Sequence, residues 1–115
     1  MNSNIILTLN LPEESILLNE GVLHALDWPR QVQIFINPDE KMLLLRACSV
    51  KARDAVVIPD DGVEQYEISG RSFLRKVRQL MDWDDDDPRI CWGEYIPAVH
   101  AVRFCLKDAV AAEQM

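Results

Sequence analysis

The sequence predicts an α+β protein: a small antiparallel sheet or barrel of short strands with two helices, built from two similar ββαββ units. Three observations lead to this prediction, namely one strong helical period, several short runs of period two, and a repeated order of elements. The 115 residues fit one domain, because a chain of this length can bury a core without disulfide or metal support. We therefore predict a single domain over residues 1–115.

The first half of the chain is predicted to form two strands, a short helix and a β-hairpin. Residues 4–10 are rich in apolar and β-branched side chains, and a second brief apolar run covers residues 15–18. Asn19 is predicted to cap the helix and Pro29 to stop it. After Pro29 the period changes to two, which predicts a hairpin over residues 31–48.

The second half begins with predicted strands at residues 52–58 and 63–68. The strongest helical period then runs over residues 68–83, with Ser69 as the predicted N-cap and Ile68 packed on Phe73 as a hydrophobic staple. Placed at about 100° per residue, the apolar side chains share one arc with Leu80 at its centre. The members of this arc are Phe73, Leu74, Val77, Leu80 and Met81.

The opposite side of this helix is basic. Arg71, Arg75 and Arg78 line up one turn apart, and Lys76 lies to one side of them. We call these four residues the basic stripe. They are the candidate binding residues of the chain, because exposed cations can meet phosphates or an acidic partner. The alternative is a solvated helix face whose arginines pair with Asp and Glu of the same chain.

The chain ends with a predicted hairpin over residues 89–95 and 100–106, followed by a tail that forms at best a frayed helix. The order of elements in residues 54–106 then matches the order in residues 4–48. Both predicted helices close on Asp-Trp followed by a proline, at residues 27–29 and 82–88. We therefore predict an internal repeat of two units.

The duplicated strand–helix–hairpin unit resembles the swapped-hairpin fold of AbrB-like regulators, in which two units intertwine their hairpins into one small barrel. One chain would supply both units here, as in MraZ-like proteins. The resemblance covers nearly the whole chain and implies a barrel that binds DNA. The second half, from Ile68 through residues 93–96 (Gly-Glu-Tyr-Ile), also looks like a small family of bacterial proteins with no established function.

An acidic run follows the main helix at Asp82 and residues 84–87. Carboxylates beyond a helix C-terminus repel one another and oppose the helix dipole, so cations should balance them. A weak metal candidate is the set Asp82, Asp84 and Asp86, although the run lacks the Gly and Glu of an EF-hand at the required positions. The other interpretation is a solvated loop neutralised by Arg78, Arg89 or bulk cations.

The sequence contains no motif of a known catalytic site. It lacks a Gly-rich phosphate loop, a nucleophile elbow and HExxH, and its two histidines, His24 and His100, are expected to be packed or surface residues. We therefore predict that the protein is not an enzyme and that it binds no cofactor. The three tryptophans, at positions 28, 83 and 92, are expected to fill the core and the helix junctions.

We expect a cytoplasmic protein. Hydrophobic residues make up 49% and charged residues 27% of the chain, which disfavours a disordered protein. The sequence shows neither a signal peptide nor a run of roughly 20 apolar residues, so we expect no membrane contact.

Cys48, Cys91 and Cys105 lack paired spacing, and an odd number suits a reducing compartment. We interpret them as buried free thiols.

Two classes of function remain open. The first is a protein-interaction module, monomeric or homodimeric, that uses the contrast between the basic stripe and the acidic residues 84–87. The alternative is an AbrB-like DNA-binding transcriptional regulator that uses the same stripe. The net charge of −7 works against nucleic acid, because cation contacts to phosphate supply most of that affinity. Pairing of the four basic side chains within their own molecule would separate the two.

Overall fold

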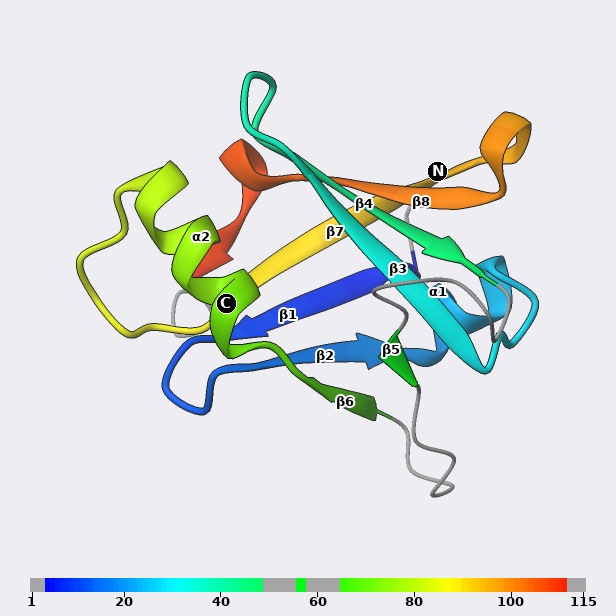
Figure 1. Cartoon of the computed structure of the whole chain (residues 1–115), viewed down its shortest axis with the longest axis horizontal. Helices are drawn as coiled ribbons and strands as arrows, with labels where there is room; N and C mark the ends of the chain where they lie inside the picture. Colours follow the sequence, from blue (N-terminus) through cyan, green and yellow to red (C-terminus); the bar gives the residue numbers. More distant parts are fainter. Residues whose placement is uncertain (1–3, 49–55, 58–64, 112–115) are drawn as a thin grey trace.

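The computed structural model describes residues 4–48, 56–57 and 65–111 and shows a curled antiparallel sheet with two α-helices (Figure 1). The predicted α+β class is confirmed. The strands are β1 (Ile6–Asn10), β2 (Ser15–Asn19), β3 (Gln31–Asn37), β4 (Met42–Ala47), β5 (Val56–Val57), β6 (Gln65–Ser69), β7 (Arg89–Ile96), β8 (Ala101–Cys105) and β9 (Val110–Ala111). The helices are α1 (Glu20–Ala25) and α2 (Arg71–Met81), with 3-10 turns η1 (Pro97–Val99) and η2 (Leu106–Asp108).

The strands follow the order β5-β3-β4-β8-β7-β1-β2-β6, and β9 pairs with β7. All the strand pairs among the described residues are antiparallel. The two hairpins, β3–β4 and β7–β8, are joined where β4 pairs with β8. Because β7 also pairs with β1, pairs of strands from the two halves of the chain, β3–β4, β8–β7 and β1–β2, alternate across the sheet. Figure 1 shows α1 and α2 at opposite ends of this sheet.

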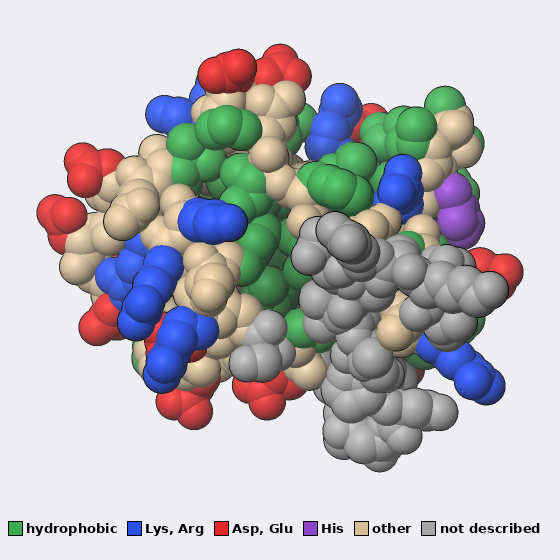
Figure 2. Space-filling view, in the orientation of Figure 1, with side chains coloured by type: hydrophobic (Ala, Val, Ile, Leu, Met, Phe, Trp, Pro, Cys, Tyr) green, Lys and Arg blue, Asp and Glu red, His purple; other side chains and the backbone are tan. Residues whose placement is uncertain are grey.

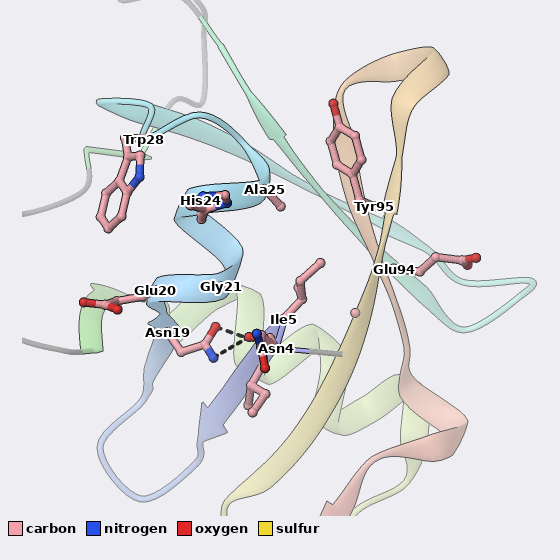
Figure 3. A pocket seen from close by; sticks show the side chains of 12 residues that line it. Asn4, Ile5, Asn19, Glu20, Gly21, His24, Ala25, Trp28, Glu94 and Tyr95 are labelled. Atoms are coloured by element: carbon pink, nitrogen blue, oxygen red, sulfur yellow. Dashed lines mark hydrogen bonds between the residues drawn. The ribbon is translucent and has the colours of Figure 1, made fainter. Parts of the chain in front are cut away.

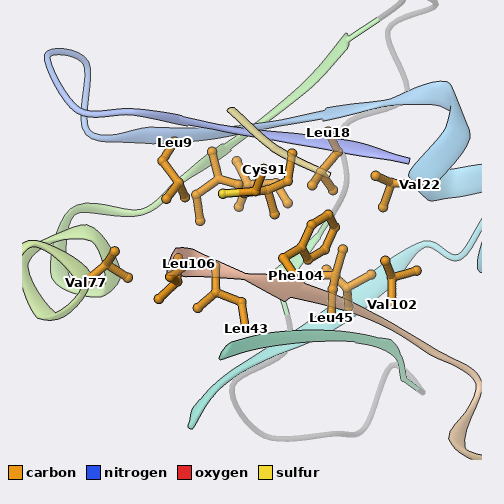
Figure 4. Packing of buried hydrophobic residues seen from close by; sticks show 14 of the residues in the cluster. Leu9, Leu18, Val22, Leu43, Leu45, Val77, Cys91, Val102, Phe104 and Leu106 are labelled. Atoms are coloured by element: carbon orange, nitrogen blue, oxygen red, sulfur yellow. The ribbon is translucent and has the colours of Figure 1, made fainter. Parts of the chain in front are cut away.

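The core lies inside the curl of the sheet. Phe104 of β8 is fully buried, and Figure 4 shows its ring among side chains that include Leu18 and Leu45. Alternate residues of the strands point inward, as the period of two predicts. For example, Leu43 and Leu45 of β4 are 1% exposed. The hydrophobic effect of this burial is the main stabilising term of the fold.

The helix α2 has the predicted buried face but a different start. Its N-cap is Gly70, whereas Ser69, the predicted cap, is the last residue of β6. The prediction was wrong because the strand ladder continues through Ser69, which pairs with Ser15, and Gly70 then donates its N–H to the Glu14 carbonyl at 3.0 Å. This start also removes the staple spacing between Ile68 and Phe73, and Ile68 is buried in the core instead.

The apolar arc of α2 is confirmed, although its deepest residues differ from the expected one. Leu74 is 2% exposed and Val77 is 0% exposed. Leu80, expected at the centre, is only half-buried and packs at the edge of the core together with Phe73 and Met81. The first turns of the helix therefore contact the core most closely.

The helix α1 is fixed by its cap. The Asn19 side chain accepts hydrogen bonds from the Val22 N–H at 3.2 Å and the Ile6 N–H at 3.0 Å, and donates to the Asn4 carbonyl at 2.6 Å. Gly21 is required beside this contact, because a Cβ there would lie 1.8 Å from the Asn4 oxygen. The predicted cap is confirmed, and it ties the helix to the start of β1.

The tail contains a short strand, β9, so the frayed helix expected there was wrong for residues 110–111. Trp28 and Trp92 are 50% and 40% exposed, so they do not fill the core as expected, whereas Trp83 packs against it. Most of the strand predicted at residues 52–58 lies outside the described residues, which include only β5.

The burial of α2 generates a stability prediction. Leu74→Ala should lower the free energy of unfolding by about 2 to 5 kcal/mol, because it removes a large side chain from a closely packed site and leaves a cavity. Arg75→Ala at the adjacent exposed position should change it by less than about 0.5 kcal/mol. Urea denaturation followed by circular dichroism would measure both. Similar losses for the two variants would contradict the assigned buried face.

Candidate functional site

The basic stripe is presented on the outer side of α2. Arg71, Arg75 and Lys76 are exposed, and the Arg78 side chain is 29% exposed. Figure 2 shows Lys and Arg side chains gathered over this end of the molecule, with Asp and Glu side chains around them. One helix therefore brings together all four predicted binding residues.

Two of the four cations form ion pairs with carboxylates of the same chain. The Arg71 Nε lies 3.0 Å from Glu14 Oε1, and Arg78 pairs with Asp86. Within the described residues, no ion pair involves Arg75 or Lys76. The centre of the stripe therefore keeps its charge, whereas both ends are neutralised and flanked by carboxylates.

The acidic run is held by Arg89, the first residue of β7. Its Nη2 lies 3.1 Å from Asp85 Oδ1, and its Nη1 donates to the Asp87 carbonyl at 3.2 Å. The guanidinium also lies 4.7 Å from the centre of the Trp83 ring, a cation–π contact. The hydrogen bond from Arg89, followed by one from the Asp87 N–H, lowers the pKa of the Asp85 carboxyl. Arg78 and Arg89 therefore pair with two carboxylates of the acidic run, Asp86 and Asp85, the two arginines that one of the two interpretations named.

The weak metal candidate is not supported by the geometry. No group of three or more His, Cys, Asp or Glu side chains among the described residues could hold a metal ion, and this includes Asp82, Asp84 and Asp86. Asp86 is instead engaged with Arg78. Asp82, Asp84 and Asp86 are all exposed.

A small depression of about 310 Å³ lies beside the basic stripe. Its apolar lining comes from Leu11 and Pro12 in the β1–β2 turn and from Leu74 of α2. Charged residues complete the rim: Glu14, Arg75, Arg78 and Asp86. Sequence reasoning missed the turn residues, because the contact of Glu14 with Arg71 spans 57 positions and no local pattern indicates such a pair.

A larger groove of about 970 Å³ lies between α1 and β7 (Figure 3). Ile5, Ala25 and Tyr95 give it an apolar lining, and His24 lies at its edge. The Tyr95 hydroxyl is hydrogen-bonded to His100 Nδ1 at 2.7 Å. The two histidines are therefore held on different elements, and only His24 lines the groove.

The cysteines differ in burial, and the predicted buried thiol is found at Cys91 alone. Cys48 and Cys105 are half-buried, and all three are free. Burial, with a smaller contribution from nearby Cys105, raises the pKa of the Cys91 thiol to about 12. Cys91 therefore stays protonated and unreactive at neutral pH.

The two kinds of arginine at this end should differ in their effect on stability. Arg89→Ala removes a side chain that is 10% exposed, together with its contacts to Trp83 and the Asp87 carbonyl, and should cost roughly 1 to 3 kcal/mol. Arg71→Ala breaks an exposed pair and should cost less than about 1 kcal/mol. Urea denaturation would measure both. Equal losses would show that Arg89 does not anchor the loop.

Among the described residues, no helix combines the length and the apolar composition needed to cross a membrane. Comparisons with protein-family models, with curated proteins and with solved structures found no match.

Proposed function

We propose that this protein is a non-catalytic protein-interaction module that binds a segment of a partner protein on the outer face of α2. The observation that carries the proposal is the internal pairing of Arg71 with Glu14 and of Arg78 with Asp86. These pairs leave Arg75 and Lys76 as a small positive centre between two carboxylates. A surface that carries both positive and negative side chains suits a protein partner, because a protein can present complementary charges of both signs.

The same pairing disfavours a nucleic-acid backbone. A duplex presents a continuous row of negative charges, and such a row would meet Glu14 and Asp86 on either side of the positive centre. Of the four cations in the basic stripe, only the central two are free of this internal neutralisation. DNA binding through the stripe would therefore gain little affinity.

The depression beside the stripe indicates the chemistry of the partner segment. Its apolar floor, formed by Leu11, Pro12 and Leu74, suits one apolar side chain. Arg75 at its rim suits a carboxylate close to that side chain. The partner segment should therefore carry an apolar residue next to an acidic one. We place this interaction in the cytoplasm, a location supported by the three free thiols.

Charge reversal with photo-cross-linking tests this proposal. A photo-cross-linking residue at exposed Gln79 should capture a specific partner in the source cell. Arg75→Glu combined with Lys76→Glu should abolish the capture, because the positive centre becomes negative. Arg30→Glu combined with Lys107→Glu, at exposed positions elsewhere, changes the net charge by the same amount and should leave it intact. Capture of the same partner by all three proteins would contradict the proposal.

The second candidate is the AbrB-like DNA-binding regulator, and the strand pairing favours the architecture behind it. We propose that residues 4–48 and 54–106 are two copies of one unit. The pair β7·β1 corresponds to β3·β5, and the hairpin β3–β4 corresponds to β7–β8. In addition, β4·β8 and β2·β6 join equivalent strands to each other, as a two-fold axis requires. A crystal structure in which the two segments do not superpose would contradict the duplication.

Salt-dependent binding to DNA separates the two candidates. If Arg75 and Lys76 bind phosphate, log K should fall with log salt with a slope of about −2, at roughly −0.9 per contact. We expect no measurable binding to random duplex near physiological salt, because two contacts are few and the net charge is −7. Fluorescence anisotropy with labelled duplex would measure it. Tight binding that is lost when Arg71, Arg75 and Arg78 are all changed to Glu would favour the regulator.

A further inference from the structure

The outer face of the sheet carries apolar side chains at positions that face solvent, where polar residues are expected. Strand alternation assigns the faces: Cys91 and Phe104 are fully buried, so Trp92 and Cys105, the next residues along β7 and β8, point outward. The register extends this row in both directions, because Cys105 is opposite Met42 and Trp92 is opposite Ile6. We call Ile6, Met42, Trp92 and Cys105 the outer row.

The outer row is accessible on the surface. The Trp92 side chain is 40% exposed, and the other three members are half-buried. One face of an antiparallel sheet is normally polar when it faces water. Apolar residues that cross four neighbouring strands, β4, β8, β7 and β1, therefore indicate a surface that becomes covered. Tryptophan is among the residues that contribute most to protein–protein binding.

The charges beside the outer row indicate what covers it. At the outward positions of β3, β4, β7 and β8, the charged residues are Arg46, Arg103 and Glu94, a balance of +1 in a chain of net charge −7. This face therefore repels an identical acidic copy less than the rest of the molecule does. Arg103 and Glu94 are directly opposite each other across β8 and β7, and their side chains form an ion pair.

We propose that two copies of this chain form a homodimer through the outer row, about a two-fold axis that runs parallel to the strands between β7 and β8. Such an axis sets Arg103 of one copy against Glu94 of the other. It also stacks Trp92 on the other copy's Cys105 and Met42 on the other copy's Ile6. The face is self-complementary in both charge and hydrophobicity, as an isologous interface requires.

Sedimentation velocity of the full chain over a wide range of concentrations tests the homodimer. The parent protein should change from monomer to dimer as its concentration rises. Trp92→Glu should raise the dissociation constant at least about tenfold, because it buries a charge at the centre of the interface. A control variant with the same change of charge, Gln79→Glu at an exposed position of α2, should dimerise like the parent.

A charge swap tests the two-fold axis itself. Arg103→Glu sets Glu against Glu across the interface and should weaken the dimer, whereas Glu94→Arg combined with Arg103→Glu restores the opposite charges and should recover it. A parent protein that stays monomeric at all concentrations would overturn the proposal. A dimer that is unaffected by Trp92→Glu, or a double swap that fails to recover association, would overturn it as well.

Alkylation of the parent protein gives a readout that does not depend on any variant. Cys105 should react more slowly as the protein concentration rises through the dissociation constant, because the other copy covers it. Cys48, which lies outside the outer row, should react at a constant rate. Mass spectrometry of the alkylated peptides would report both. If Cys105 is alkylated at the same rate at all concentrations while the protein sediments as a dimer at the higher ones, the interface lies elsewhere.

Discussion

The fold depends on β7, which pairs with β8 on one side and with β1 on the other. Without the pairing of β7 with β1, the strands β1, β2 and β6 would separate from the two joined hairpins. Gly93 makes this position possible, because a Cβ there would lie within 2.7 Å of Phe104, Ile5 and Val102. Its N–H also donates to the Ile5 carbonyl at 2.8 Å. The close approach of β7 to the core thus fixes both the barrel-like curl and the outward direction of Trp92.

Sequence patterns predicted correctly the features of the fold that depend on interactions between residues close together in the chain. The period of α2, the Asn19 cap and both hairpins follow from neighbouring residues, and the sequence was sufficient for each of them. Ser69 was assigned wrongly because its backbone pairs with Ser15, 54 positions away in the chain, and this pairing outweighs the intrinsic preference of serine for a cap. The three tryptophans were assigned to the core and the helix junctions, although strand alternation alone would have placed Trp92, the neighbour of buried Cys91, on the opposite face of β7.

The candidate site, too, could be predicted only in part from the sequence. Its cations were predictable, because they lie on one helix and repeat at one turn. Their charge state was not, because Glu14 reaches Arg71 from a distant turn. For the acidic run, in contrast, the pairing could be anticipated. Four successive carboxylates predicted that cations lie nearby, and Arg78 and Arg89 form ion pairs with two of them. The electrostatic cost of the run is therefore offset in part, and the pairing of Arg78 with Asp86 helps to leave Arg75 and Lys76 as the distinct positive centre.

The two proposed surfaces use different elements, so one protein could use both at once. The α2 face lies on the helix, whereas the outer row crosses β4, β8, β7 and β1. A dimer formed through the outer row would therefore carry two copies of the α2 face, related by the two-fold axis. A partner with two suitable segments would bind the second face at a high effective concentration once the first is occupied. A small positive centre that binds weakly alone would gain affinity in this way without any additional contact.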